Sequence, residues 1–480
     1  MERRTKIIAT IGPASDSETT LRELVDAGMD VARLGLAHGT LDEALERYRR
    51  IRKISNDMGK RVGILVDLPG PKIRSAPFPS EGSLLEKGST IKLIPGVKQS
   101  SETIVEVDYE NVLEDLVPGD VIPFGDGQVV VRVEAIGNNE AEATVTSGGI
   151  LHGRPGIRIP SERLSLPTPT DDDLHKLDAF VEEGVDMVAV SYVRSAHDVR
   201  RVGTEPHPRG PLVVAKIETR AAVENLMGII EASAAIMVAR GDLGTEFEIA
   251  DLPHLQKKII AECIAGGLPV ITATQMLDSM INTSSPTRAE ASDVANAVFD
   301  GTSAVMLSGE TAIGSYPVES VETMARIAER ADQSFDFGRW AERVAELRQS
   351  SDADSGNGGS QGITDAMTLA TWRAANELDL AALLCISGSG FTVRSMARFR
   401  PNVPILGMTM DERTAQQLTL SWGVTPFCIE AAMGYEERIG NAIATAKSEG
   451  ILQSNDLIGV LAGITGDSPA TDVLRIMRVV

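Results

Sequence analysis

Charged and hydroxyl residues that could do chemistry stand at the ends of several short aliphatic runs. Arg33 lies in "DVARL", and Lys216 and Glu218 close "PLVVAKIE". Asp242 closes "AIMVARGD", and Thr274 closes "LPVITAT". Cations beside carboxylates suit an anionic substrate with a divalent metal, because Mg²⁺ prefers oxygen ligands from one or two carboxylates, substrate and water. These residues predict such a site if the fold gathers the ends of the runs.

The spacing of the aliphatic runs predicts a fold that gathers their ends. Eight strand-then-helix units favour an α/β fold, the (β/α)8 TIM barrel, whose active face is formed by the carboxyl ends of the strands. The first turn, "TIGPAS", lacks the GxGxxG of a dinucleotide-binding sheet. Polar residues also expected at this face are Asp67, Arg240, Ser308 and Glu310. The eight runs cover residues 5–12, 30–36, 61–68, 185–193, 211–218, 235–242, 268–275 and 303–310.

Two breaks in this rhythm predict further domains. A stretch of short β-like segments and turn residues predicts an inserted all-β lid over the active face. The polar segment "QSSDADSGNGGSQG", residues 349–362, predicts a loop or linker, and three strand-like runs after it predict a separate α/β domain. The expected boundaries are 1–74 and 161–345 for the barrel, 75–160 for the β lid, and 346–480 for the C-terminal α/β domain.

Composition limits the partners and the compartment. The 480 residues carry a formal net charge of -22, which repels nucleic acid and anionic membranes, so we expect neither as a partner. The three cysteines are widely spaced and favour reduced thiols. Since the N-terminus lacks an apolar signal region and no run of 18 apolar residues occurs, a cytoplasmic protein is expected.

Each candidate residue also has a purely structural interpretation. Lys216 and Glu218 face the same side of a strand and could form an internal ion pair that closes the barrel. Gly241 in "ARGDLGTE" lets the backbone approach an anion, although a plain capping turn uses the same residues. Thr274 could bind substrate or cap the next helix. We favour a joint site, because random surface charge would not select the same end of each strand.

The motifs, taken in chain order, resemble those of the pyruvate kinase family over essentially the whole chain. The resemblance implies phosphoryl transfer from phosphoenolpyruvate to ADP, giving pyruvate and ATP, with Mg²⁺ or Mn²⁺ required. It also implies that the C-terminal domain serves effector binding and assembly, with a homotetramer as the common state. The motifs are "RRTKIIATIGPAS", "DAGMDVARL", "GPKIR", "GVDMVAVSYVR", "IMVARGDLG", "ATQMLDSM", "PTRAEASDVANAVFDG" and "LSGETAIGSYPVE".

The resemblance implies a role for each matching residue. Glu218 and Asp242 match the metal ligands, and Arg33 matches the arginine that holds the phosphoryl group. Lys216 matches the lysine that stabilises the transferring phosphoryl group and the enolate oxygen. The matches for the substrate carboxylate are Gly241, Asp242 and Thr274, and those for the nucleotide side are Arg74, His38 and the lid acid Asp126.

The chain departs from the family where K⁺ would bind. "RLGLAHG" stands for the family's "RLNFSHG", so Gly35 and Ala37 replace two cation ligands. "DLPGPKIR" stands for "DTKGPEIR", so Leu68 replaces a third ligand and Asp67 alone remains. Lys72 replaces a Glu, and relatives with Lys there are K⁺-independent. We therefore predict that K⁺ is not required and that the Lys72 ammonium substitutes for it; a surface lysine at the lid hinge is the alternative.

Two further departures concern nucleotide and effector. The lid reads "GRPGIRIP" where the family has "RKGVNLP", so Pro155 removes a lysine expected near nucleotide phosphates, and Arg158 is a candidate replacement. "SGSGFT" offers hydroxyl and N–H groups for an effector phosphate, or forms a generic turn, since Gly388 and Phe391 replace basic residues. The possible effector loop comprises Ser387, Ser389, Gly390 and Thr392.

Three functions fit these residues unequally. Pyruvate kinase accounts for the intact Arg33, Lys216, Glu218, Asp242 and Thr274, which argue against a non-catalytic or repurposed paralogue. A pyruvate-kinase-like paralogue with altered substrate or nucleotide, or a non-catalytic regulatory partner, would explain the lost Asn and lid Lys. A metal-dependent lyase on the same fold needs no nucleotide clamp, so the lid, Arg33 and Arg74 argue against it.

Overall fold

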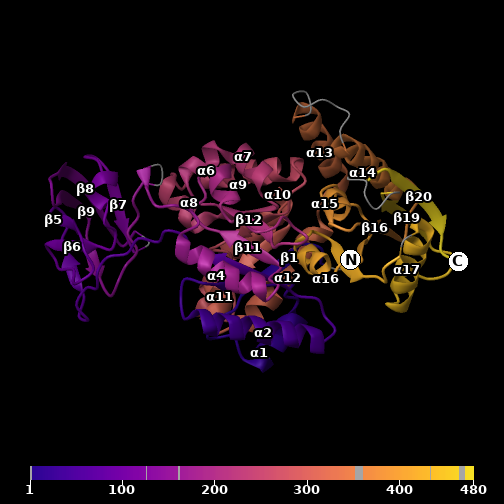
Figure 1. Ribbon diagram of the computed structural model, residues 1–480, viewed down its shortest axis with the longest axis horizontal. Coiled ribbons are helices and arrows are strands. Elements are labelled where there is room, and N and C mark those ends of the chain that lie inside the picture. The colour runs from indigo at the N-terminus through magenta and orange to yellow at the C-terminus, as the bar shows by residue number, and fades with distance from the viewer. Residues whose placement is uncertain (1–2, 126, 161–162, 352–359, 433, 464–470) are drawn as a thin grey trace.

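A closed eight-stranded parallel barrel forms the centre of the computed structural model (Figure 1). Its strand order is β1-β15-β14-β13-β12-β11-β3-β2, with every neighbouring pair parallel. The TIM barrel expected from the eight runs is therefore confirmed. The strands are β1 (Lys6–Thr10), β2 (Val31–Gly35), β3 (Gly63–Leu68), β11 (Met187–Val190), β12 (Leu212–Ile217), β13 (Ala235–Ala239), β14 (Val270–Ala273) and β15 (Ala304–Leu307).

Aliphatic side chains fill both faces of the barrel wall. Within the barrel, Ile8, Leu65 and Met237 belong to one buried cluster, while Ile7 and Val66 pack outward with the surrounding helices. Burial on both faces explains why the strands appear in the sequence as continuous aliphatic runs. The helices of this part are α1 (Glu18–Ala27), α2 (Leu41–Asp57), α4 (Asp171–Glu182), α5 (Ala196–Arg200), α6 (Arg220–Glu224), α7 (Leu226–Ala232), α8 (Arg240–Glu246), α9 (Leu252–Ala265), α10 (Arg288–Asp300), α11 (Gly309–Ala312) and α12 (Pro317–Gln333), with a 3₁₀ turn η2 (Asp278–Ile281).

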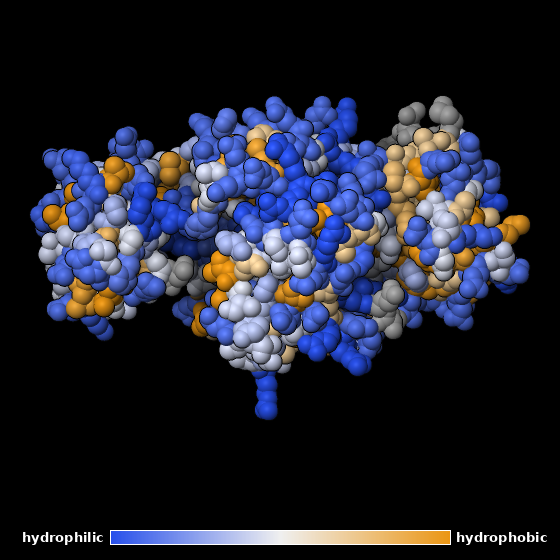
Figure 2. All heavy atoms as spheres, turned by 90° about the horizontal axis from the view of Figure 1, so that it is seen from below, coloured by the Kyte–Doolittle hydropathy of each residue, from blue (hydrophilic) through white to orange (hydrophobic). Residues whose placement is uncertain are grey.

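The chain between β3 and β11 carries a lobe of short β-strands, β4 to β10, where the sequence predicts the β lid; this lobe projects from one end of the barrel (Figure 1). Five strands form one sheet in the order β6-β5-β9-β8-β7, and β10 pairs with β4. The lid has its own buried core, which includes Leu93, Phe124 and Val131. Figure 2 shows a hollow edged by hydrophilic residues between this lobe and the barrel. The elements are β4 (Ser83–Leu85), β5 (Thr90–Pro95), β6 (Ile104–Val107), α3 (Val112–Asp115), β7 (Val121–Phe124), β8 (Val129–Ile136), β9 (Ala141–Ser147) and β10 (Gly149–Leu151).

A second α/β unit lies on the opposite side of the barrel from the lid (Figure 1). Its sheet has the order β18-β17-β16-β19-β20, with β20 antiparallel at the edge. The expected linker is wrong at both ends, because residues 349–351 continue α13 and residues 360–362 begin α14. The elements are α13 (Phe337–Ser351), α14 (Ser360–Glu377), β16 (Ala382–Ile386), α15 (Phe391–Ala397), β17 (Ile405–Thr409), α16 (Glu412–Gln417), η4 (Leu418–Leu420), β18 (Val424–Cys428), α17 (Tyr435–Ser448), β19 (Leu457–Ala462) and β20 (Val473–Arg478).

A buried arginine joins this unit to the barrel. The guanidinium of Arg400 lies 4.6 Å from the ring centroid of Phe335 and 4.7 Å from that of Trp422. It donates to the carbonyl of Thr302 at 2.6 Å, and burial lowers its pKa to about 9. Aromatic faces and a carbonyl thus solvate the cation where the two units meet.

The residues described by the structure include no helix long and apolar enough to span a membrane. The described ranges are 3–125, 127–160, 163–351, 360–432, 434–463 and 471–480.

Candidate active site

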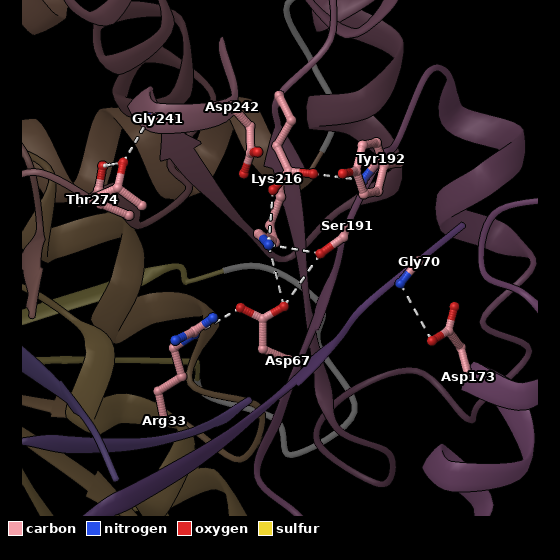
Figure 3. A network of polar contacts seen from close by, with 12 residues as sticks. Arg33, Asp67, Gly70, Asp173, Ser191, Tyr192, Lys216, Gly241, Asp242 and Thr274 are labelled. Atoms are coloured by element: carbon pink, nitrogen blue, oxygen red, sulfur yellow. Dashed lines mark hydrogen bonds and ion pairs between the residues drawn. The ribbon is translucent and has the colours of Figure 1, made fainter. Parts of the chain in front are cut away.

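Asp67, at the end of β3, is the hub of a buried ion-pair network (Figure 3). Its carboxylate accepts a hydrogen bond from the Nε of Arg33 at 2.7 Å and lies 3.3 Å from the Nζ of Lys216. Burial alone would raise the pKa of Asp67, but the charges of Lys216 and Arg33 outweigh it and lower the pKa below its usual value. The ionised carboxylate therefore holds both cations at the same mouth of the barrel.

Lys216, near the end of β12, is enclosed by three oxygen-bearing side chains. Its Nζ lies 2.7 Å from Ser191 Oγ and 2.8 Å from Glu218 Oε1, in addition to its contact with Asp67. Burial acts to lower the pKa of Lys216, yet Asp67 and Glu218 raise it above its ordinary value. The ammonium therefore stays charged at the barrel mouth, as stabilisation of an anion requires.

Glu218 is held by a strained residue of the neighbouring strand end. The backbone N–H of Tyr192 donates to Glu218 Oε2 at 2.7 Å, and Tyr192 has a left-handed φ of 57°. Positive φ is unfavourable for a bulky residue, so the surrounding structure must enforce this conformation. Burial raises the pKa of Glu218 despite the nearby charge of Lys216.

Asp242 lies in the first turn of α8 and faces a cation from the lid. Its Oδ1 is 2.6 Å from Arg158 Nη2, and its carbonyl accepts a hydrogen bond from Arg158 Nη1 at 3.0 Å. Burial acts to raise the pKa of Asp242, but Arg158 and then Lys216 outweigh it and lower the pKa. Arg158, suggested by the sequence as a nucleotide residue, thus contacts a candidate metal ligand in this structure.

Thr274 and Gly241 contact each other at the ends of β14 and β13. The Gly241 N–H donates to Thr274 Oγ1 at 2.7 Å, and Thr274 Oγ1 lies 2.7 Å from the carbonyl of Ala273. Thr274 has a φ of 68°, and Arg240 braces its carbonyl at 2.7 Å. The N–H expected to meet a substrate carboxylate therefore has an intramolecular acceptor here.

Two of the residues matched to the nucleotide side, His38 and Arg74, lie near each other. Burial lowers the pKa of His38, and the charges of Lys72 and Arg74 lower it further. The Nη1 of Arg74 also donates to the carbonyl of Arg154 in the lid at 3.2 Å. Asp126 lies outside the described residues.

The positions of the replaced K⁺ ligands differ in their surroundings. A Cβ added to Gly35 would lie 3.8 Å from Arg33 Nη2, so a side chain there would border the residue expected to bind the phosphoryl group. Leu68 is fully buried in the aliphatic core, while Ala37 and Lys72 are exposed. The charge of Lys72 contributes to the lowered pKa of Asp242 after the larger effects of Arg158 and Lys216.

The possible effector loop lies in the C-terminal unit, apart from the barrel mouth (Figure 1). Gly390 has a φ of 75°, and the Phe391 N–H donates to Ser389 Oγ at 3.4 Å. The hydroxyl of Thr392 pairs with that of Thr471 at 2.7 Å, and the Ser387 N–H donates to Met408. These hydrogen bonds stabilise a turn. Binding of an effector phosphate by this loop stays a prediction.

Sequence reasoning missed two residues of the network, and the structure gives Glu310, which was expected at the active face, contacts with two loops. Ser191 and Tyr192 follow β11, and their hydroxyl groups in "AVSYV" are the sequence signal that marks this strand end. Glu310 accepts the N–H groups of Leu277 at 3.0 Å and Ser308 at 2.7 Å, so it ties loops together.

The chemistry of the donors at Glu218 and Asp242 fits a hard divalent cation. Both carboxylates follow adjacent strands, β12 and β13, and the charges of both act on Lys216. Within the described residues, no group of three or more His, Cys, Asp or Glu side chains is placed to hold a metal. A metal here would therefore take its remaining ligands from substrate and water.

A parallel barrel with charged residues at one mouth defines a TIM-barrel enzyme. The family description "Pyruvate kinase, barrel domain" matches residues 2–321, and "Pyruvate kinase, alpha/beta domain" matches residues 365–477. The chain therefore belongs to the pyruvate kinase family, which consists of phosphotransferases.

Relatives and a solved structure agree with this assignment. The chain is 37% identical over 483 residues to a pyruvate kinase of Clostridium acetobutylicum, covering 99% of this chain and 100% of the relative. It is 38% identical over 480 residues to one of Staphylococcus saprophyticus, covering 99% and 80%. The crystal structure of a pyruvate kinase from Cryptosporidium parvum superposes with a TM-score of 0.91 at 30% identity, covering 99% and 96%.

Proposed function

We propose that this chain transfers the phosphoryl group of phosphoenolpyruvate to ADP, giving pyruvate and ATP. The observation that carries the proposal is the charged Lys216 beside Arg33 at the barrel mouth, both held by buried Asp67. Phosphoryl transfer needs positioning and neutralisation of charge more than covalent chemistry. Two fixed cations at one mouth meet that need.

The residues would divide the work as follows. Arg33 binds the phosphoryl oxygens, and Lys216 stabilises the phosphoryl group in transit and the enolate oxygen left behind. The substrate carboxylate binds near Gly241, Asp242 and Thr274, where the Thr274 hydroxyl must exchange its present partners for substrate and water. The enolate then takes a proton at carbon through water near Thr274.

Divalent-metal dependence and independence from K⁺ belong to the same proposal. Glu218 and Asp242 would hold Mg²⁺ or Mn²⁺, which when bound neutralises phosphate charge and orients the transferring group. Lys72 would supply the positive charge otherwise given by K⁺. Its influence on the pKa of both His38 and Asp242 supports a location beside the nucleotide and metal residues.

The remaining assignments are parts of this proposal. His38, Arg74 and Asp126 would serve the nucleotide, and the loop of Ser387, Ser389, Gly390 and Thr392 would take an effector phosphate. The domain boundaries of the sequence analysis, a homotetramer and a cytoplasmic location complete it.

A coupled assay tests the proposal. Pyruvate formation is followed with phosphoenolpyruvate, ADP and Mg²⁺, with either K⁺ or a bulky organic cation as the monovalent salt. We expect pyruvate at similar rates in both salts. Absence of pyruvate in both would refute the activity, and strong stimulation by K⁺ would refute the role of Lys72.

A further inference from the structure

Arg158 connects the segment that returns from the lid to the start of α8 in the barrel. On the lid side, its backbone N–H donates to the carbonyl of Pro123 at 3.2 Å. On the barrel side, its guanidinium contacts the Asp242 carboxylate at 2.6 Å, the Asp242 carbonyl at 3.0 Å, and the Thr245 hydroxyl. One side chain thus fastens the lid segment to three acceptors in two residues of α8.

The contact is specific and partly shielded from solvent. The side chain of Arg158 is 22% exposed and that of Asp242 is 34% exposed. A guanidinium that binds a carboxylate and two neighbouring oxygens at once is held in one orientation. The contact therefore differs from a mobile surface ion pair.

The other candidate metal ligand has a different kind of neighbour. Glu218 forms an ion pair with Lys216 at 2.8 Å and accepts a hydrogen bond from the Tyr192 N–H at 2.7 Å. Both partners lie at strand ends of the barrel itself. Lys216 is also held by Asp67 and Ser191, so it cannot leave without breaking the hub. Of the two cations that contact Glu218 or Asp242, Lys216 belongs to the barrel, whereas Arg158 belongs to the segment that returns from the lid.

A cation bound to Asp242 would meet the charge of Arg158 at close range. Like charges on one carboxylate repel, and this repulsion is weakly screened in a partly buried site. The charges of the network already balance without a metal, because it holds three carboxylates and three cations. The carboxylates are Asp67, Glu218 and Asp242, and the cations are Arg33, Lys216 and Arg158. Additional positive charge therefore favours the departure of one cation, and Arg158 is the one of these three that does not lie on a barrel strand.

We propose that Arg158 is the counter-ion of Asp242 in the metal-free enzyme and that it must leave this carboxylate when a divalent cation binds there. Metal binding and docking of the lid segment on α8 then oppose each other. The released guanidinium is free to bind the phosphate oxygens of an incoming substrate. This inference rests on the metal site of the proposed function and assigns to Arg158 a role in controlling access to it.

Direct binding of Mn²⁺ to the full-length protein, followed by electron paramagnetic resonance without nucleotide or phosphoenolpyruvate, tests the inference. Arg158→Gln removes the charge and keeps a polar side chain. We expect its Kd for Mn²⁺ to fall by about 5- to 100-fold relative to wild type, the usual range of coupling between two sites. Arg158→Lys keeps the charge without the planar fork, so its Kd should lie between those of wild type and Arg158→Gln.

Arg154→Gln is the matched control. Arg154 lies four residues earlier in the same return segment and pairs with Asp108 at 2.6 Å, within the lid. Its Kd for Mn²⁺ should equal that of wild type. Tighter binding by both variants would refute a specific role of Arg158, because any loss of lid charge would then suffice.

Asp242→Asn separates failure of this inference from failure of the metal assignment. It should weaken Mn²⁺ binding at least tenfold if Asp242 is a ligand. If Asp242→Asn weakens binding but Arg158→Gln binds Mn²⁺ as wild type does or more weakly, the counter-ion role is refuted and the metal site stands. If Asp242→Asn binds Mn²⁺ as wild type does, the metal site itself is refuted, and the role of Arg158 with it.

Discussion

The guanidinium of Arg33 lies 2.7 Å from the carboxylate of Asp67, which is only 3% exposed. Arg33 comes from β2 and Asp67 from the adjacent β3, so the ion pair crosses between two neighbouring strands of the barrel. The guanidinium also donates to Thr10 Oγ1 at 2.9 Å. Arg33 is therefore oriented before any substrate arrives, which reduces the entropic cost of binding an anion.

Replacement of Asp67 should disrupt this orientation and destabilise the barrel. Asp67→Asn keeps the shape but removes the charge that faces Arg33 and Lys216. Breaking a buried ion pair typically costs about 3–5 kcal/mol, because a charge is left uncompensated. We expect a lower melting temperature and a large loss of kcat/KM. Normal stability with normal activity would contradict the hub role of Asp67.

Lys216→Met should remove most of the transition-state stabilisation, and it should also lower the melting temperature, because Asp67 and Glu218 lose a shared buried counter-ion. We expect kcat to fall by about 10³-fold, the scale seen when a cation is removed from the transferring phosphoryl group. Lys92→Met is the control, since Lys92 pairs with Glu140 in the lid at 2.9 Å. Steady-state kinetics of both variants would show whether the loss is specific. A kcat within threefold of wild type for Lys216→Met would contradict its assignment.

Thr274 is expected to act through its hydroxyl. Thr274→Ala should lower kcat by about 100-fold, the lower end of contributions from positioned proton-transfer groups. Thr274→Ser keeps the hydroxyl that accepts the Gly241 N–H, and it should retain most of the activity. Equal losses in both variants would point to the strained backbone at φ 68°, and not to the hydroxyl, as the important feature.

Lys72→Glu tests the replacement of K⁺. The variant places a carboxylate where we propose that an ammonium serves, so activity in K⁺-free buffer should fall at least tenfold. Added K⁺ should restore part of the activity only if K⁺ can bind without the ligands that Gly35, Ala37 and Leu68 replace. The measurement is the initial rate across K⁺ concentrations for wild type and variant. Unchanged K⁺-free activity would show that Lys72 is a surface lysine without this role.

His207 should make the contact between barrel and C-terminal unit sensitive to acid. Its Nδ1 lies 3.4 Å from Arg394 Nη2. Burial, and to a lesser extent the charge of Arg394, lowers the pKa of His207 to about 4. Its unfolded pKa is about 6.5. The stabilising contribution is therefore complete above pH 6.5 and is lost as the pH falls toward 4, because only the unfolded chain then binds the proton.

The comparison with His207→Gln isolates this effect. Melting temperatures are measured for both proteins from pH 8 to pH 4. We expect the wild type to lose stability relative to the variant only below about pH 6.5. A constant difference across the whole range would show that His207 does not titrate between these values.

Barrel strands were predictable because both of their faces are buried. Strand β3, "GILVDL", is buried at every residue and appears in the sequence as one aliphatic run. The edge strands β18 and β20 of the C-terminal sheet were missed for the opposite reason. Strand β18 contains Pro426, and β20 is partly exposed along its length and contains Arg475 and Arg478. Such strands lack the continuous pattern that marks a buried strand.

The site was predictable as a set of residues but not as a set of contacts. The strand-end rule identified Arg33, Asp67, Lys216 and Glu218. Lys216 and Asp67 are 149 residues apart in the chain, so only closure of the barrel brings them together. The contact of Arg158 with Asp242 depends on the position of the lid relative to the barrel. Local sequence patterns do not determine that position.

The fate of the phosphorus atom tests the central claim most directly. Phosphorus NMR of the full-length protein with phosphoenolpyruvate, ADP and Mg²⁺, in buffer free of K⁺, follows the phosphoryl group itself. We predict that the phosphoenolpyruvate signal is replaced by the γ-phosphate signal of ATP, and that Lys216→Met shows no transfer over the same period. Release of inorganic phosphate without ATP, or an unchanged phosphoenolpyruvate signal, would contradict the account.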